Sequence, residues 1–509
     1  MSRLALPAVL AFLAALVAGP VPAAASPPAP AAAVAAVAPA AALSENVHLF
    51  YYPWYGSPAV SGGYRHWPQG GHTPPDDVGA DLYPVLGAYD SGDFTGAVEQ
   101  QMRWVEQSGA GVIVYSWWGQ GSYEDGLAQG VLDAANRHGV KVAWHLEPYG
   151  DRTAASTVDD IRYINARYGG HPAFYRSAEH GDKGAFYVFS SLSVPDADWA
   201  ALDAVTGDSI VLAQTTDTSR IAHFSGLYTY DAIAGATAPG WEGAGEYAKA
   251  HGLIWAPSVG PGYVDDRAVP GNTTPTLGRA DGATYDLEWG NALDPAKGGV
   301  PTWVSVTSFN EWHEGSVIEP ARSSPPGGFG YQTFEGAYGR TGAGAETAYL
   351  DRTAYWAAEF EARRATSPAV NLALHKAATA DGSCNANEGA EKAVNGSVSG
   401  GNSDKWCSLG AAKWLRVDLG APTPVGRIVL RHAGAGGEPA RFDTRDFDLQ
   451  VSTDGASWTT VVSARGNTAD VTTHVIAPVS ARYVRLNVLV PTQDSDRAAR
   501  VYELEAYSV

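Results

Sequence analysis

Residues 110–149 read AGVIVYSWWGQGSYEDGLAQGVLDAANRHGVKVAWHLEPY, and this stretch decides the fold of the long N-terminal part of the chain. The β-branched and aromatic run 110–118 predicts a strand, the amphipathic segment 122–138 a helix, and 140–149 a second strand. A strand, a helix and a strand in this order predict parallel strands joined by a crossover helix.

The same alternation extends outward on both sides. Further strands are expected at 47–55, 185–192, 209–216, 226–231, 252–259 and 302–310, with helices at 93–108, 156–168 and 240–251. Eight strands within 45–364 predict an α/β fold, a (β/α)8 (TIM) barrel. A doubly wound open sheet is the alternative, but no glycine-rich phosphate motif follows the first strand.

The character of the sequence changes near residue 365. We interpret 365–370 as a linker. From 371 to 509 short alternating segments such as WLRVDL (414–419) and YVRLNV (483–488) replace the helical pattern. This predicts an all-β sandwich as a second domain.

The N-terminus has the features of an export signal. Residues 1–25 begin with the basic segment Met1-Ser2-Arg3, continue through an apolar run at 4–17 and end in three alanines, which predicts a signal peptide and a secreted protein. That run is too short for a membrane span. Residues 26–44, mostly Ala, Pro and Val, predict a linker. In an exported chain Cys384 and Cys407 are expected to form one disulfide, with a two-cysteine metal site as the alternative.

Composition restricts the partners. The 509-residue chain carries 34 Lys and Arg against 54 Asp and Glu, a net charge of −20, so nucleic acid and anionic membranes are poor partners. The 16 Trp and 25 Tyr outnumber the 13 Phe. Such polar-tipped rings suit either large cores or the stacking of sugar rings.

Chemistry in such a barrel lies at the C-terminal ends of the strands. On strand 140–149 Val142, Trp144 and Leu146 share one face, which sends His145 and Glu147 toward the barrel mouth. The eighth strand runs into Glu311 and Glu314. Two carboxylates in a cleft with aromatic walls indicate glycosidic cleavage, with Glu147 and one eighth-strand glutamate as nucleophile and acid. A zinc site of His145, Glu147, His313 and Glu314 is the alternative, although its spacing fits no ligand motif.

Seven sequence motifs, in the same order along the chain, match a known enzyme family. They are YYPWYG (51–56), PPDDVGADLYP (74–84), WHLEPY (144–149), HPAFYR (171–176), GLYTYDA (226–232), PSVGPGYVDDR (257–267) and TSFNEWHEG (307–315). Together they resemble glycoside hydrolase family 99, the endo-α-mannosidases and endo-α-1,2-mannanases. The resemblance implies a retaining, endo-acting α-mannosidic hydrolase that needs no cofactor for catalysis.

The resemblance also assigns roles. It implies that Glu314 is the acid/base and that Glu311 deprotonates the sugar 2-hydroxyl, giving a 1,2-anhydro sugar, whereas Glu147 positions substrate. Trp118 stands where bacterial members acting on mannose-capped chains carry Trp and vertebrate members carry Tyr, which implies mannan or mannose-rich glycans. The expected substrate-binding residues are Tyr52, Trp54, His72, Trp117, Trp118, His145, Glu147, Tyr230, Tyr263, Asn310 and His313.

The C-terminal segment resembles the discoidin or coagulation factor 5/8 type C domain, including family 32 carbohydrate-binding modules, through WLRVDLG (414–420), FDLQVSTDGASW (447–458) and YELEAY (502–507). The resemblance implies a galactose-binding-like jelly roll with a carbohydrate ligand. It also implies one structural calcium ion, with Asn395 and Glu505 as candidate ligands.

The leading hypothesis is therefore a secreted, monomeric α-mannan hydrolase with a carbohydrate-binding module. Two alternatives stay open: a catalytically inactive glycan-binding or adhesion protein, and a barrel hydrolase of another α-polysaccharide.

Overall fold

The computed structural model describes residues 42–230, 241–366 and 371–508. The expected signal peptide, most of the 26–44 linker, Asp231 at the end of strand 226–231, and 367–370 of the second linker lie outside the described residues. None of the described helices combines the length and apolar character that crossing a bilayer requires.

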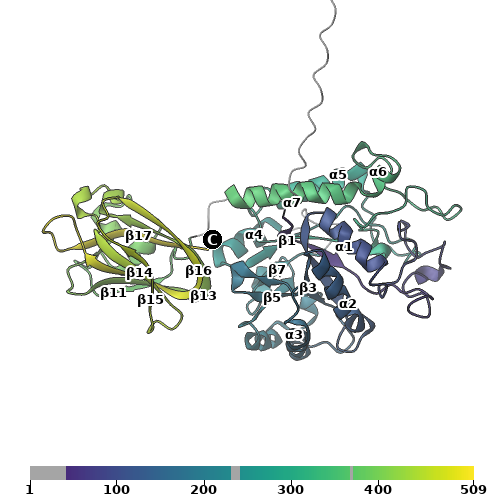
Figure 1. Cartoon of the computed structure of the whole chain (residues 1–509), viewed down its shortest axis with the longest axis horizontal. Coiled ribbons are helices and arrows are strands. Elements are labelled where there is room, and N and C mark those ends of the chain that lie inside the picture. The colour runs from purple at the N-terminus through teal and green to yellow at the C-terminus, as the bar shows by residue number, and fades with distance from the viewer. Residues whose placement is uncertain (1–41, 231–240, 367–370, 509) are drawn as a thin grey trace, which may run out of the picture. The chain divides into compact units, whose positions relative to one another are not determined.

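The N-terminal domain is a barrel of parallel strands, which confirms the expected fold class (Figure 1). All eight expected strands are present. Their bounds are β1 (Ser44–Tyr51), β2 (Ala110–Trp117), β3 (Lys141–Leu146), β5 (Lys183–Val188), β6 (Ser209–Gln214), β7 (Gly226–Tyr228), β8 (Ile254–Ala256), β9 (Ser258–Val259) and β10 (Val304–Val306). A two-residue strand, β4 (Arg176–Ser177), adds antiparallel to β5.

Pro257 divides the seventh expected strand into β8 and β9. Proline has no N–H for a sheet ladder. β8 pairs with β7, while β9 pairs with β10, and β10 in turn pairs with β1. The ring is therefore closed through the chain itself at Pro257, whose carbonyl accepts a hydrogen bond from Ser305 N at 2.9 Å.

Helices surround the strands (Figure 1). They are α1 (Ala97–Gln107), α2 (Tyr123–Arg137), α3 (Ala154–Tyr168), α4 (Trp241–His251), α5 (Ala283–Ala292), α6 (Ala343–Glu346) and α7 (Ala348–Thr366). Side-chain caps fix the starts of two of them. The Ser122 hydroxyl accepts from Asp125 N at 3.0 Å before α2, and Thr153 with Ser156 forms a capping box before α3.

Alternation along the strands separates the helix-facing residues from the barrel interior. Trp144 stacks on Tyr168 of α3, with ring centroids 5.2 Å apart, as strand parity predicts. Inside the barrel the fully buried Phe50, Tyr187 and Tyr228 pack edge to face or tilted. The interior below the mouth is thus a packed aromatic core, and only the strand ends can form a cleft.

The C-terminal domain is an antiparallel β-fold, as expected. Its strands are β11 (Ala377–Ala380), β12 (Trp406–Ser408), β13 (Lys413–His432), β14 (Asp446–Ser452), β15 (Thr459–Ala464), β16 (Val471–Val490) and β17 (Ala499–Tyr507). The long strands β13 and β16 pair over most of their length, with register shifts that bend them. Leu415, Val417 and Leu486 lie in its separate apolar core.

Candidate active site

The turn after β10 carries Glu311 and Glu314. The Ser308 hydroxyl accepts a hydrogen bond from Glu311 N at 2.8 Å, and a single 3₁₀ turn, Trp312–Glu314, follows. The turn ends at Gly315, which has φ of 55°. A Cβ there would lie 2.6 Å from Val264 Cγ1, so only glycine fits.

Both glutamates line one cleft of about 610 Å³ at the barrel mouth. Glu311 is buried and accepts a hydrogen bond from His313 N at 3.2 Å, whereas Glu314 is half-buried. Burial raises the pKa of Glu311 well above its usual range, and the negative charges of Glu314 and Glu147 raise it further. A buried carboxylate with a raised pKa is a strong proton acceptor once it is ionised.

His313 is held as a neutral imidazole. Its Nε2 lies 3.1 Å from the backbone oxygen of His66, and because a carbonyl oxygen only accepts, Nε2 carries the proton. Burial lowers the pKa of His313 to about 3. His66 in turn stacks on Trp54, with ring centroids 4.4 Å apart and planes 9° from parallel. These contacts fix one wall of the cleft.

A second network leads from Glu147 to the cleft. Glu147 Oε1 accepts from the Ser116 hydroxyl at 2.7 Å, and that hydroxyl accepts from Trp118 Nε1 at 3.1 Å. His145 Nδ1 lies 2.9 Å from Glu147 Oε1, while its Nε2 is 3.0 Å from the Tyr228 hydroxyl. Glu147 therefore orients Trp118 through Ser116, and Trp118 lines the same cleft as Glu311 and Glu314.

Asn310 joins the turn to β1. Its side-chain oxygen accepts from Tyr52 N at 2.7 Å, and its side-chain nitrogen donates to Tyr52 O at 3.0 Å. The Tyr52 hydroxyl bonds to that of Tyr230. Tyr263 lines the cleft and donates to Asp265 Oδ2 at 3.0 Å.

Four of the eleven expected substrate-binding residues line the cleft: Trp54, Trp118, Tyr263 and His313. The other seven do not: Tyr52, His72, Trp117, His145, Glu147, Tyr230 and Asn310. Two of these seven point elsewhere. Trp117 is fully buried and donates to Asp125 Oδ1 of α2 at 3.1 Å, because it follows Ser116 on the strand and so points to the opposite face. His72 lies 2.8 Å from Asp77 Oδ1 and 3.1 Å from Arg267 O, joining two loops. Neither is among the side chains that line the cleft.

Sequence reasoning missed several cleft residues. Gln69, His66, Glu124, Asp265 and Val269 also line it. Glu124 had a usable signal, because it lies in the first turn of the helix that follows a predicted strand end. Burial raises the pKa of this carboxyl, and Glu147 adds to the rise.

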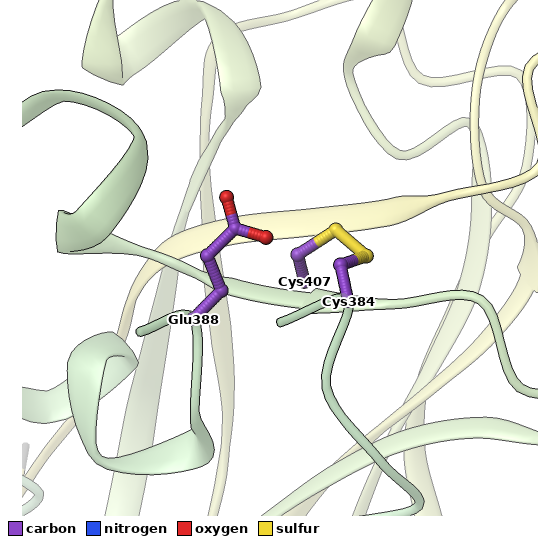
Figure 2. A group of neighbouring side chains, drawn as sticks. All are labelled: Cys384, Glu388 and Cys407. Carbon is purple, nitrogen blue, oxygen red and sulfur yellow. A yellow bond between two sulfur atoms is a disulfide. The ribbon is translucent and has the colours of Figure 1, made fainter. Parts of the chain in front are cut away.

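In the C-terminal domain the two cysteines are joined. Cys384 and Cys407 form a disulfide with Cα atoms 5.3 Å apart, and Glu388 lies beside it (Figure 2). Among the described residues, these three are the one group of at least three His, Cys, Asp or Glu side chains close enough to share a metal. The bonded sulfurs are not thiolates, and Glu388 is paired with Lys405 at 3.3 Å.

Asn395 and Glu505 are the expected calcium ligands, and the carboxylate that contacts the Asn395 loop directly is Glu503. Glu503 Oε1 accepts from Gly396 N at 2.8 Å. Both oxygens of Glu505 are occupied, one by Arg431 Nε at 2.5 Å and the other by the Tyr507 hydroxyl. Asn395 donates to Asp404 Oδ1 at 2.7 Å, so the loop itself is closed by an acidic side chain.

Comparisons with known proteins agree with this geometry. The model of glycosyl hydrolase family 99 matches residues 42–362, and that of the F5/8 type C domain matches residues 377–504. The chain is 35% identical over 325 residues to a glycoprotein endo-alpha-1,2-mannosidase-like protein of Danio rerio, a match covering 56% of this chain and 72% of the relative.

It is also 33% identical over 369 residues to a glycoprotein endo-alpha-1,2-mannosidase of Mus musculus, covering 64% of this chain and 77% of that one. A solved GH99 endo-alpha-mannosidase from Bacteroides thetaiotaomicron is 34% identical, with a TM-score of 0.56, 64% of this chain and all of that chain covered. The chain therefore belongs to glycosyl hydrolase family 99, as an endo-α-mannosidase-like hydrolase whose barrel is followed by an F5/8 type C domain.

Proposed function

We propose that this protein is a secreted, retaining, endo-acting hydrolase of α-mannan or mannose-rich glycans. The observation that carries this proposal is the pair Glu311 and Glu314, three residues apart on one turn and lining one cleft with Trp54 and Trp118. The carboxylates supply the acid and base that glycosidic cleavage needs, and the rings supply flat surfaces for sugars.

The proposed reaction has two steps. Glu314 gives its proton to the leaving oxygen as that oxygen separates from the anomeric carbon, while Glu311 takes the proton of the 2-hydroxyl, whose oxygen bonds to the anomeric carbon. Water then opens this 1,2-anhydro sugar: Glu314 takes the water proton and Glu311 returns its proton to the 2-oxygen. Two inversions at one carbon retain its configuration. The raised pKa of Glu311 supports its role as the base.

Hydrolysis of a purified α-1,2-linked mannan tests this function. We expect the full-length protein to release oligosaccharides of several lengths, with the α-configuration of the new reducing end seen first by NMR. A mannan left intact after long incubation would contradict the proposal, as would equal cleavage of α-glucan. The inactive glycan-binding alternative would be favoured by binding to mannan without cleavage.

Trp118 is expected to form a sugar-stacking surface. Replacing Trp118 by alanine removes that surface and should lower kcat/KM on mannan about 10-fold, mainly through KM, because stacking is worth about 1.4 kcal/mol. Michaelis–Menten kinetics on mannan measure this. Tyr355→Ala is the matched control, since Tyr355 is an exposed ring on α7. Equal effects of the two changes would count against the stacking role.

We also propose that the C-terminal domain binds a glycan and holds a structural calcium ion near Glu503. Within the described residues Glu503 Oε2 is buried without a hydrogen-bond partner, and burial raises the pKa of this carboxyl to about 7. Such an oxygen suits a hard cation, which would be held by Glu503 with loop carbonyl oxygens and would link the loop to β17.

Removing calcium should therefore destabilise this domain. A chelator is expected to lower its Tm by about 5 °C or more in calorimetry of the full chain, because a ligand bound only to the folded state stabilises it. Glu503→Gln should abolish this response, whereas Glu505→Gln should keep it, since Glu505 is bonded to Arg431 and Tyr507. Mannan hydrolysis well below Tm should not change. An identical Tm with and without chelator would refute the calcium site.

Export and oligomeric state complete the proposal. We expect the mature protein to begin near Ser26 and to be a monomer. Mass spectrometry of protein from the culture medium and light scattering measure these two properties.

A further inference from the structure

A fully buried carboxylate, Glu319, lies behind the catalytic turn. Its Oε1 accepts from Gln101 Nε2 at 3.0 Å. Its Oε2 accepts from the Tyr89 hydroxyl at 2.9 Å and from Trp312 Nε1 at 2.9 Å. Three neutral donors from three separate parts of the chain thus converge on one carboxylate that takes no part in the proposed chemistry.

Two of these donors belong to the network that flanks Glu311. Trp312 directly follows Glu311, and its Nε1 also lies 3.1 Å from the Tyr89 hydroxyl oxygen. On the other side of Glu311, Asn310 Nδ2 donates to the same hydroxyl oxygen at 3.2 Å. Contacts that begin at Glu319 therefore hold both neighbours of Glu311.

The third donor fixes Glu319 to the barrel wall. Gln101 lies on α1, and its side-chain oxygen accepts from the Tyr51 hydroxyl of β1 at 2.7 Å. The ionisable groups facing Glu319 are Tyr89 from the loop before α1 together with Tyr51 and Tyr55 of the β1 segment. Their pKa values are raised, so they stay neutral, and a charge on Glu319 is stabilised by hydrogen bonds alone.

A carboxylate suits this position because it only accepts hydrogen bonds. The Tyr89 hydroxyl must then donate to Glu319, which leaves its oxygen free to accept from Asn310 and Trp312. Glutamine would present an amide N–H₂ to one of the donors. A site that needed only filling would avoid a buried carboxylate, since burying one is costly.

We propose that Glu319 is a positioning residue that, through Trp312 and Tyr89, holds the 310–314 turn in the geometry in which Glu311 and Glu314 react. This inference rests on the proposed function. A failure of this inference can be told apart from a failure of the proposed function, because wild-type hydrolysis of mannan tests the function without reference to Glu319.

Glu319→Gln tests the role. We expect kcat on mannan to fall about 10- to 100-fold while KM stays within about twofold, because a displacement of the order of 1 Å at reacting groups costs up to about 100-fold. Asp286→Asn is the matched control: Asp286 accepts from Trp356 Nε1 at 2.8 Å and from Arg352 but lies on α5. A lower Tm for Glu319→Gln with wild-type kcat would overturn the proposal.

The pH profile gives a second readout. Burial raises the pKa of Glu319 to about 7, so as the pH falls through 7 the carboxyl gains a proton and, like glutamine, presents a donor to one of its three partners. The ratio of wild-type to Glu319→Gln kcat should therefore decline between pH 8 and pH 5. A ratio that is constant over this range would contradict the positioning role.

Exchanging the two residue types at positions 101 and 319 should restore the activity that Glu319→Gln loses. In Gln101→Glu with Glu319→Gln, the carboxylate and amide trade places: the amide of residue 319 can donate to residue 101 and accept from Tyr89 and Trp312. We expect most of kcat to return. A restored Tm with kcat still low would refute the proposal. If Glu319→Gln does not fold, Tyr89→Phe serves instead, because it removes the hydroxyl that links Glu319 to Asn310 and Trp312 while the direct bond from Trp312 to Glu319 stays. It should lower kcat at constant KM, and a wild-type kcat would overturn the proposal.

Discussion

Replacing Glu314 by glutamine should lower kcat on mannan by about 10²- to 10⁴-fold, the usual contribution of a general acid. The amide keeps the size of the side chain but cannot protonate the leaving oxygen. Initial rates of reducing-end release measure the change. Mannan binding by calorimetry should be retained, because the cleft rings are untouched.

Substrates with different leaving groups test whether Glu314 is the general acid. An aryl α-mannobioside has a phenolate leaving group that departs without a proton. The Glu314→Gln variant should therefore lose far less of its bond-breaking rate on this substrate than on mannan. Glu346→Gln is the matched control, since Glu346 accepts from the Ser323 hydroxyl at 2.8 Å, outside the cleft. Equal losses on both substrates would assign Glu314 another role.

Replacing Glu311 by glutamine should cause a loss of similar size, about 10²- to 10⁴-fold, because the 2-hydroxyl then has no base. The wild-type rate should rise with pH through the raised pKa of Glu311, so the acid limb lies above the usual glutamate range. Glu147→Gln removes one of the negative charges that raise this pKa and should move the limb to lower pH. A pH–kcat/KM profile measures both effects, and a limb at pH 4 would contradict the assignment.

Stability provides an independent check on Glu311. A carboxyl whose pKa is raised by folding stabilises the protein at low pH, and that stability is lost as the pH rises through the folded-state pKa. Glu311→Gln should therefore raise Tm at pH 8 and leave it unchanged at pH 4. An unchanged Tm at both values would mean that Glu311 is not held in a desolvated site.

Much of the barrel followed from local patterns. All eight strands were predictable because parallel strands covered by helices are continuous runs of β-branched and aromatic residues. Parity along one strand also indicated that His145 and Glu147 face away from Trp144. The same rule, applied to the preceding strand, would have moved Trp117 away from the cleft, because Trp117 alternates with Ser116.

Other features depend on contacts between distant segments. Pro257 marks the break in the seventh strand, but only the pairing of β8 with β7 and of β9 with β10 shows that the ring closes there. Glu503 and Glu505 lie two residues apart on one face of β17, so the alternation of the strand does not show which of them contacts the Asn395 loop. Their partners, the Asn395 loop and Arg431, lie about 70 to 110 residues away.

The sequence by itself determined the repeat of strands and helices, the change to a β-sandwich and the motifs that carry Glu311 and Glu314, because these depend on neighbours a few residues apart. Only the tertiary structure decided which carboxylates are buried together. The raised pKa values of Glu311 and Glu319 arise mainly from desolvation by burial. Desolvation is a property of the packed surroundings of a side chain, and no short stretch of sequence contains those surroundings.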